Sequence, residues 1–234
     1  GVAHDFNNLL TAIIGHADLL MLKYSPSDDS FADINQIKQN ANRAANLVRQ
    51  LLAFSRQQTL QPRVLDVGYA LADLGNLLRR LLGAGVVLNL RHGRDLALVK
   101  VDRVQLEQVV INLAVNARDA MDGAGAVDIS TQMETVGETI GTRLEPMPAG
   151  DYVRIDVADN GSGIEPEHLG RIFEPFFTTK AVGEGTGLGL STVYGIVKQT
   201  GGFIFVDSKV GRGSTFSLYL PPHEETAEAA AETQ

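Results

Sequence analysis

Two glycine clusters constrain the fold of this chain more than any other feature of its sequence. The first, Gly161 and Gly163, follows Asp159 at the end of an apolar run, and the second, residues 185–189, immediately precedes an apolar helical pattern. Without a Cβ, glycine lets the backbone approach a flat ligand closely. A helix that begins in a glycine loop also presents free N–H groups and a positive dipole end to an anion. The pattern indicates a nucleotide site, although each cluster alone is also typical of a plain turn or a flexible loop.

The N-terminal quarter of the chain has a helical hydrophobic pattern. Apolar residues recur at steps of three and four over 6–21 and again over 31–52, separated by a turn-forming stretch at 25–29. This predicts an antiparallel helical hairpin. Because two amphipathic helices cannot cover their own apolar stripes, we expect the hairpin to pair with a second copy in a four-helix bundle, or to pack on its own chain.

After a polar stretch at 57–63, interpreted as a linker, the pattern alternates as in strands. An α/β sandwich is expected, with an exposed hairpin excursion at 136–150. The fold class is therefore α+β, with a helical hairpin at 1–60, a ligand-binding domain at 61–222 and a disordered tail or linker at 223–234. The expected strands are 64–67, 86–91, 97–101, 126–134, 152–158, 203–207 and 215–220, and the expected helices are 70–82, 104–121 and 190–199.

Composition excludes several classes of function. A formal net charge of −8 provides no broad positive field, so we expect no nucleic-acid partner and no direct membrane contact. The absence of cysteine excludes a disulfide framework, a thiolate metal site and a thiol nucleophile. No apolar run approaches the roughly 20 residues of a membrane helix. The chain opens inside a helical pattern, which indicates a fragment; we expect a cytoplasmic fragment, whose parent protein can be anchored in the inner membrane.

Between the glycine clusters lie residues suited to a metal ion and phosphates. Asn112 and Asn116 are four residues apart on one predicted helix and share a face, so their amide oxygens could coordinate Mg²⁺. Apolar anchors at 173–177 are followed by Lys180, whose ammonium could meet phosphate. The alternatives are asparagines bonded to neighbouring backbone and a small hydrophobic plug with a solvated lysine.

The order of these motifs resembles the histidine kinases and, more broadly, the GHKL (Bergerat) ATP-binding family shared with gyrase, Hsp90 and MutL. The resemblance covers 1–221 and rests on the boxes at 112–116, 159–163, 173–180, 185–189 and 211–216. It implies that Asp159 binds the adenine amino group of ATP and that Asn116, with Asn112, binds Mg²⁺. The remaining nucleotide-binding residues that the resemblance implies are Gly161, Gly163, Lys180, Gly185, Thr186, Gly187, Leu188, Gly189 and Thr215.

Two positions bear on what happens to the phosphate. The ATPases of the broader family place a glutamate where this chain has Asn112, so the resemblance favours phosphoryl transfer over hydrolysis. Many histidine kinases place Lys or Arg three residues after the metal-binding asparagine, where this chain has Asp119. Arg118 is the available substitute.

The residues His4, Asp5, Phe6, Asn7 and Asn8 resemble the phosphoacceptor box of the same family. A neutral imidazole nitrogen is a nucleophile near pH 7, and Asp5 could orient the ring by accepting a hydrogen bond. Asn8, one helical turn after His4, could direct water at a phosphoimidazole and so support phosphatase chemistry. A solvated helix face is the alternative interpretation of this segment.

We therefore predict an ATP-dependent protein histidine kinase core of the His-Asp-Phe-Asn-Asn subgroup, which includes hybrid kinases of the alphaproteobacterial cell-cycle type. Its expected partners are a second copy, a response-regulator receiver domain in trans or C-terminal in a hybrid parent, a phosphotransfer protein and upstream sensor domains. A GHKL-type ATPase and a non-enzymatic dimeric nucleotide sensor are the alternatives. The other histidines show no metal-ligand spacing.

Overall fold

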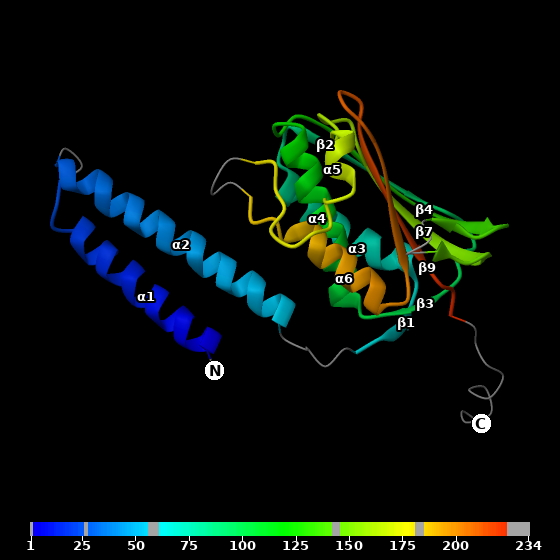
Figure 1. Cartoon of the computed structure of the whole chain (residues 1–234), viewed down its shortest axis with the longest axis horizontal. Helices are drawn as coiled ribbons and strands as arrows, with labels where there is room; N and C mark the ends of the chain where they lie inside the picture. The colour runs from blue at the N-terminus through cyan, green and yellow to red at the C-terminus, as the bar shows by residue number, and fades with distance from the viewer. Residues whose placement is uncertain (1, 26–27, 56–60, 142–145, 181–184, 224–234) are drawn as a thin grey trace. The chain divides into compact units, whose positions relative to one another are not determined.

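The computed structural model describes residues 2–25, 28–55, 61–141, 146–180 and 185–223 of the 234-residue chain. It consists of two units, which Figure 1 colours from blue at the N-terminus to red at the C-terminus. One unit comprises Gly1–Thr59 and Thr178–Thr186, and the other comprises Leu60–Phe177 and Gly187–Gln234. The first contains a helical hairpin and the second is an α/β sandwich, so the predicted fold class is confirmed.

The hairpin consists of α1 (Val2–Met21) and α2 (Asp29–Ser55), in agreement with the two apolar stripes. Ala17, Ile34 and Ala41 are buried between the helices, where the two small side chains allow close packing. Asp28 accepts the N–H of Ser30 at 2.9 Å and so caps the start of α2. Within the described residues, no helix is long and apolar enough to cross a membrane. Several large apolar side chains of the hairpin stay exposed in the single chain, namely Leu9, Ile13, Leu19, Leu20 and Ile37.

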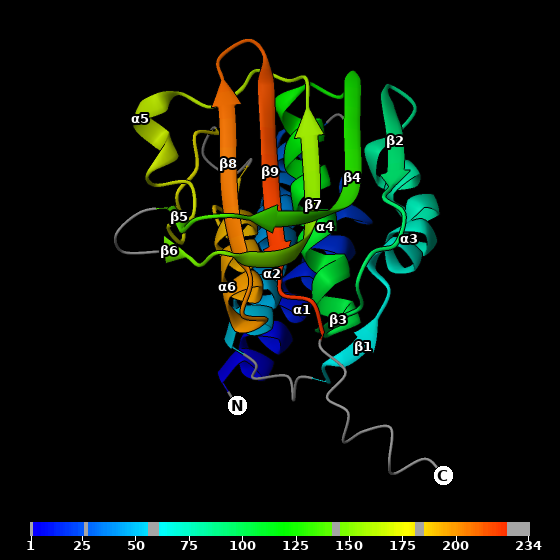
Figure 2. The same cartoon turned by 90° about the vertical axis from the view of Figure 1, so that its right-hand side faces the viewer.

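The sandwich is built on a five-stranded sheet in the order β2-β4-β7-β9-β8. β2 (Val86–His92) runs parallel to β4 (Gly125–Val136), and the other neighbours are antiparallel: β7 (Gly150–Asp159), β9 (Gly213–Leu220) and β8 (Phe203–Lys209). A separate antiparallel pair joins β1 (Arg63–Leu65) to β3 (Val99–Val101). Figure 2 shows the helices α3 (Val67–Leu82), α4 (Arg103–Ala120) and α6 (Gly189–Gln199) behind the sheet, so they cover one of its faces.

Alternation along β7 decides which side chains face the helices. Val153, Ile155 and Val157 are buried in the core beneath the helices, so Asp159, next in the same series, points to the same face. The register agrees, because Asp159 pairs with the fully buried Val127 of β4. The sheet therefore presents the Asp159 carboxylate on its helix-covered face.

The structure differs from the sequence expectations at several places. The strand expected at 64–67 ends at Leu65, because the Asp66 carboxylate accepts the N–H of Tyr69 at 3.1 Å and starts α3. The excursion at 136–150 forms the expected hairpin, β5 (Ile140–Gly141) with β6 (Pro146–Met147), but Met147 is fully buried rather than exposed. The one-turn helix α5 (Pro166–Leu169) was not expected. The linker at 57–60, Gly183 and the tail at 224–234 lie outside the described residues.

Candidate functional site

Asp159 lies at the end of β7, with one carboxylate oxygen held by the backbone. Oδ1 accepts the N–H of Gly161 at 2.8 Å and the N–H of Ser214 at 3.3 Å. Burial raises the pKa of this carboxyl above its ordinary value, and the two N–H groups oppose that shift without cancelling it. Among the described residues no donor reaches Oδ2, so this oxygen can accept a hydrogen bond from a ligand.

The turn after Asp159 is fixed against backbone on two sides. The N–H of Ser162 donates to the carbonyl of Ala120 at the end of α4 (2.9 Å), and the carbonyl of Ser162 accepts from Gly211 (2.7 Å). Gly163 has φ +73°, and a Cβ there would collide with the carbonyl of Lys209. Glycine is therefore required for the turn to lie between α4 and the β8–β9 hairpin.

The predicted adenine contact of Thr215 is not supported by the strand register. Thr215 pairs with Ala158 on β7 and with Asp207 on β8, so its side chain faces away from the helices. Ser214, one residue earlier, is buried and donates its N–H to Asp159. The sequence interpretation missed Ser214 because a shift of one residue exchanges the two faces of a strand.

The predicted asparagines of α4 lie beside the start of α6. Asn112 donates its amide N–H to the carbonyl of Gly189 at 3.3 Å, and its Oδ1 accepts from Gln108 at 3.4 Å. The amide of half-buried Asn116 lies within 4 Å of the point where Gly189 would carry a Cβ. Leu188, the N-cap of α6, offers no side-chain acceptor to the first N–H groups of that helix. The side chains of Asn112 and Asn116, which we call the asparagine face of α4, are thus adjacent to the N-terminus of α6, which has no side-chain cap from Leu188.

This arrangement fits Mg²⁺ bound through oxygen. In the described parts of the chain, no cluster of three or more His, Cys, Asp or Glu side chains could hold a metal ion. Mg²⁺ retains several waters and commonly binds through a few protein oxygens together with substrate phosphates. The amide oxygens of Asn112 and Asn116 beside an anion-attracting helix end are compatible with that coordination.

Arg118 is directed away from the asparagine face. Its Nη1 donates to the carbonyl of Leu81 near the end of α3 at 2.9 Å. Its Nε and Nη2 both donate to Oδ1 of Asp119, at 3.0 and 2.7 Å. The sequence suggested that Arg118 could substitute for the Lys or Arg that many histidine kinases carry at position 119. This is not supported, because its guanidinium donates to the carbonyl of Leu81 and to Asp119.

The segment between Phe176 and Gly187, which we call the lid, is joined at its two ends within the sandwich. Phe176 donates its N–H to the carbonyl of Gly187 at 2.9 Å, and both residues have positive φ, +68° and +65°. A Cβ on Gly187 would collide with the backbone of Phe176. Phe177 is contacted by the guanidinium of Arg171, 4.7 Å from the ring centre. Phe173 packs against half-buried Tyr194, with ring centres 5.4 Å apart, and both residues pack against the hydrophobic core.

Inside the lid, the described residues are polar and mostly exposed. Lys180 is exposed, and its backbone N–H donates to Oγ1 of Thr178 at 3.2 Å. Thr186 is exposed and Gly185 is half-buried. A Cβ on Gly185 would lie 2.5 Å from Oγ1 of Thr178, so this position also favours glycine.

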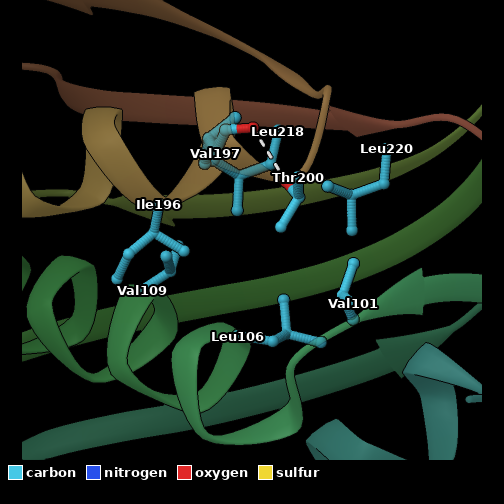
Figure 3. Close-up of a pocket in the computed structure, with 8 residues that line it drawn as sticks. All are labelled: Val101, Leu106, Val109, Ile196, Val197, Thr200, Leu218 and Leu220. Atoms are coloured by element: carbon cyan, nitrogen blue, oxygen red, sulfur yellow. Dashed lines mark hydrogen bonds between the residues drawn. The ribbon is translucent and has the colours of Figure 1, made fainter. Parts of the chain in front are cut away.

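A small apolar hollow between α4, α6 and β9 is part of the core rather than of this site. Figure 3 shows its lining, which includes none of the predicted nucleotide residues. Its one polar side chain, Thr200, donates to the carbonyl of Val197 at 2.8 Å. The lining residues are Val101, Leu106, Val109, Ile196, Val197, Thr200, Leu218 and Leu220.

The predicted phosphoacceptor residues belong to the hairpin unit. His4, Asp5 and Asn8 all lie within α1, with His4 and Asn8 one helical turn apart in sequence. Asn8 is exposed. The sandwich, in turn, brings together Asp159, Gly161 and Gly163 at one turn, and Asn112, Asn116, Leu188 and Gly189 at the start of α6.

Comparison with known families assigns both parts of the chain. Residues 101–224 match the family described as "Histidine kinase-, DNA gyrase B-, and HSP90-like ATPase". Residues 1–60 match the "His Kinase A (phospho-acceptor) domain". The two matches fall on the sandwich and on the hairpin, respectively.

Two sensor kinases are similar in sequence to nearly the whole chain. The sensor kinase CckA of Brucella abortus (strain 2308) is 58% identical over 221 residues, which are 94% of this chain and 23% of that protein. The sensor histidine kinase ZraS of Escherichia coli (strain K12) is 32% identical over 222 residues, 94% of this chain and 44% of ZraS. The chain thus spans less than half the length of these relatives.

Solved structures share the fold. Full-length ShkA in complex with AMPPNP superposes with a TM-score of 0.70 at 24% identity, covering 97% of this chain and 46% of that one. The histidine kinase ThkA in complex with the response regulator protein TrrA gives a TM-score of 0.61 at 25% identity, covering 95% of this chain and 60% of ThkA.

Proposed function

The chain belongs to the histidine kinases, and from this membership we propose that it moves the γ-phosphoryl group of ATP to His4 and then to an aspartate of a response-regulator receiver domain. One observation carries the proposal: a phosphoacceptor helix containing His4 and an ATP-binding fold containing Asp159 occur in the same chain. We assign 1–60 to dimerisation and phosphotransfer, 61–222 to catalysis, and 223–234 to a tail or linker.

Nucleotide binding follows from the sandwich geometry. Oδ2 of Asp159 accepts an N–H of the adenine amino group, while Oδ1 remains held by Gly161 and Ser214. The phosphates lie at the N-terminus of α6, whose first N–H groups and dipole favour negative charge. Lys180 and the loop that includes Gly185, Thr186 and Gly187 cover them. Asn116 and Asn112 would hold Mg²⁺, which would neutralise part of the phosphate charge.

In the first reaction, one imidazole nitrogen of His4 attacks the γ-phosphorus. The N–P bond forms as the bond from phosphorus to the β,γ-bridging oxygen breaks, and ADP leaves. Asp5 accepts the proton on the other ring nitrogen in a hydrogen bond, which keeps the attacking nitrogen unprotonated. In the second reaction, the phosphoryl group passes from nitrogen to a receiver carboxylate, and neutral His4 is restored.

Asn112 favours transfer over hydrolysis. Its amide cannot take a proton from water, and its N–H is already bonded to the carbonyl of Gly189. The same position in the ATPases of the broader family carries a glutamate, which can act as a base. This position therefore supplies no base to activate water, and a GHKL-type ATPase is the weaker candidate.

The hairpin supports two further functions. Its exposed apolar side chains, including Ile13 and Leu20, favour a homodimer in which two hairpins form a four-helix bundle. Asn8, exposed and one helical turn after His4 in α1, orients a water that hydrolyses the aspartyl phosphate of the receiver, which releases inorganic phosphate and restores the receiver carboxylate. The proposed signalling system also contains a receiver, a phosphotransfer protein and upstream sensor domains. We place this chain in the cytoplasm.

Incubation with γ-labelled ATP separates the three candidate functions, once dimerisation has been verified. A kinase acquires acid-labile, alkali-stable label that is lost in His4→Ala and in Asn116→Ala. An ATPase releases phosphate without becoming labelled. A nucleotide sensor binds ATP and does neither, and this outcome in a dimeric, folded wild type would overturn the proposal.

A further inference from the structure

Two serines next to Asp159 form a hydrogen-bonded pair that no step above uses. Ser208 on β8 lies directly opposite Ser214 on β9, and their hydroxyl oxygens are 2.9 Å apart. Ser208 Oγ also accepts the N–H of Ile164 at 2.8 Å and lies 3.1 Å from the carbonyl oxygen of Gly213. Ile164 follows the turn that begins at Asp159, so Ser208 connects this turn to the β8–β9 hairpin.

The neighbours of Ser208 favour one direction for the bond between the two hydroxyls. Ser208 has one hydroxyl proton and two lone pairs. The N–H of Ile164 can only donate, and the carbonyl of Gly213 can only accept, so the Ser208 proton goes to Gly213. The remaining lone pair of Ser208 then accepts the proton of Ser214. Ser214 therefore has only lone pairs left for any other neighbour.

Ser214 is a neighbour of Asp159, the residue to which the proposed function assigns the purine. Its backbone N–H donates to Oδ1 of Asp159, and its side chain is on the helix-covered face of the sheet, as is that of Asp159. A purine bound at Asp159 would therefore have two acceptors near its edge, Oδ2 of Asp159 and Oγ of Ser214. The 6-amino group of adenine offers two N–H donors there, whereas a 6-oxo purine offers a lone pair.

We propose that Ser208 is a specificity-determining positioning residue, which selects 6-amino over 6-oxo purine nucleotides by holding the Ser214 hydroxyl as an acceptor. The proposal rests on the proposed nucleotide site and identifies how that site distinguishes bases. Ser208 acts through Ser214 and does not itself contact the nucleotide. If Ser208 cannot accept, the Ser214 hydroxyl can rotate and donate to a 6-oxo group.

The test compares ATP with ITP, which carries a 6-oxo group and lacks the amino group, by competition against a fluorescent ATP analogue on the intact chain. Wild type is expected to bind ATP at least about tenfold more tightly than ITP. A site whose acceptors pair with a ligand N–H donor rejects a ligand that presents an acceptor at the same point. Ser208→Ala should reduce this ratio about tenfold, mainly through tighter ITP binding. Ser208→Thr keeps the hydroxyl and should keep the ratio.

Two further variants separate specificity from stability. Ser217→Ala removes a hydroxyl on the opposite sheet face, where it donates to Asp156 at 2.6 Å, and should leave the ratio unchanged. The double variant Ser208→Ala with Ser214→Ala cannot donate, so the gain in ITP binding should disappear. If Ser208→Ala fails to fold, Ser214→Ala alone should still weaken discrimination, about threefold, because one of two acceptors is lost.

Three outcomes would overturn the inference while the nucleotide site stands. They are an unchanged ATP-to-ITP ratio in folded Ser208→Ala, an equal gain for ITP in the double variant, and a wild type that binds ATP and ITP equally. If wild type binds neither nucleotide, the proposed function fails instead, and the inference with it.

Discussion

At the scale of single residues, Asp159 combines an energetic cost of burial with the adenine-binding role proposed for it. Desolvation raises its carboxyl pKa, outweighing the N–H donors of Gly161 and Ser214. Folding therefore favours the protonated form. The associated stabilisation is complete below the pKa of the unfolded chain and is lost as the pH rises through the folded pKa. At neutral pH the ionised carboxylate lowers the free energy of unfolding, as is common for groups retained for function.

Replacing Asp159 by asparagine should separate these two effects. The amide keeps Oδ1 for both backbone N–H groups but presents an NH₂ where the adenine amino group binds. We expect an unchanged or higher melting temperature and a loss of ATP affinity of about 10–100-fold, because two donors then face each other. Calorimetric titration and a thermal scan measure both quantities. An unaltered ATP affinity would remove Asp159 from the base-binding role.

Asp156→Asn is the matched control for that substitution. Asp156 accepts from Arg154 Nε at 2.8 Å and from Ser217 Oγ at 2.6 Å on the sheet face away from the helices. Its substitution should lower the melting temperature, because a charged acceptor of Arg154 is lost. It should leave ATP affinity unchanged, in contrast to Asp159→Asn.

The raised pKa of Asp159 also predicts a pH dependence of binding. As the pH falls through this pKa, the carboxylate is protonated and loses acceptor capacity for adenine. ATP affinity should therefore begin to fall at a higher pH than an ordinary aspartate would produce. A binding titration from pH 8 to about pH 4 measures this change, and Asp159→Asn should flatten the profile in that range.

At the scale of elements, sequence periodicity was sufficient for the long helices and the sheet strands, because each buries one regular face. Periodicity failed where an element is too short to show a period, or where the position of a side chain depends on a residue distant in sequence. Helix α5 has only four residues, too few to show a period. Met147 is buried by packing with residues of other strands, Tyr152 and Tyr219 among them. The direction of Arg118 depends on a carbonyl of α3, which the sequence of α4 does not reveal.

The candidate site could be predicted where sequence motifs mark its residues, but not where strand pairing decides which side chains meet. The motif order pointed to Asp159 and the two asparagines; the structure has Asp159 bonded to the turn at Gly161 and Asn112 bonded to Gly189 at the start of α6. It could not distinguish Ser214 from Thr215, since only the register pairing Thr215 with Ala158 does so. The serine pair behind Asp159 was likewise invisible, because Ser208 and Ser214 meet only across two strands.

The join between Phe176 and Gly187 is the element that the lid depends on. Gly187→Ala introduces a Cβ at φ +65° against the Phe176 backbone, which should destabilise the closed join by about 2 kcal/mol or more. We expect weaker ATP binding, measured by titration. Gly195→Ala, within α6 and with no atom within 4 Å of its new Cβ, should instead stabilise by about 0.5–1 kcal/mol and leave ATP binding unchanged. Equal effects of the two variants would contradict this role of the join.

At the scale of the whole molecule, the account requires two hairpins to cover each other's apolar surface. Ile13 is 45% exposed in the single chain, on a helix that carries other exposed apolar residues. Ile13→Glu should shift the sedimentation of the protein from dimer toward monomer while leaving ATP affinity intact, because the sandwich is a separate unit. Gln39→Glu, on an exposed polar position of α2, should not change the association state. A wild-type monomer at all concentrations would contradict the dimer.

The central claim is that the phosphoryl group leaves ATP for His4 and not for water. A single-turnover reaction of the verified dimer with limiting γ-labelled ATP measures both fates at once, as phosphohistidine mapped to His4 and as released inorganic phosphate. We predict that label appears on His4 at the rate at which ATP is consumed, with little phosphate released. Asn116→Ala should abolish both the labelling of His4 and the consumption of ATP. Stoichiometric phosphate release with His4 unlabelled throughout would contradict the account.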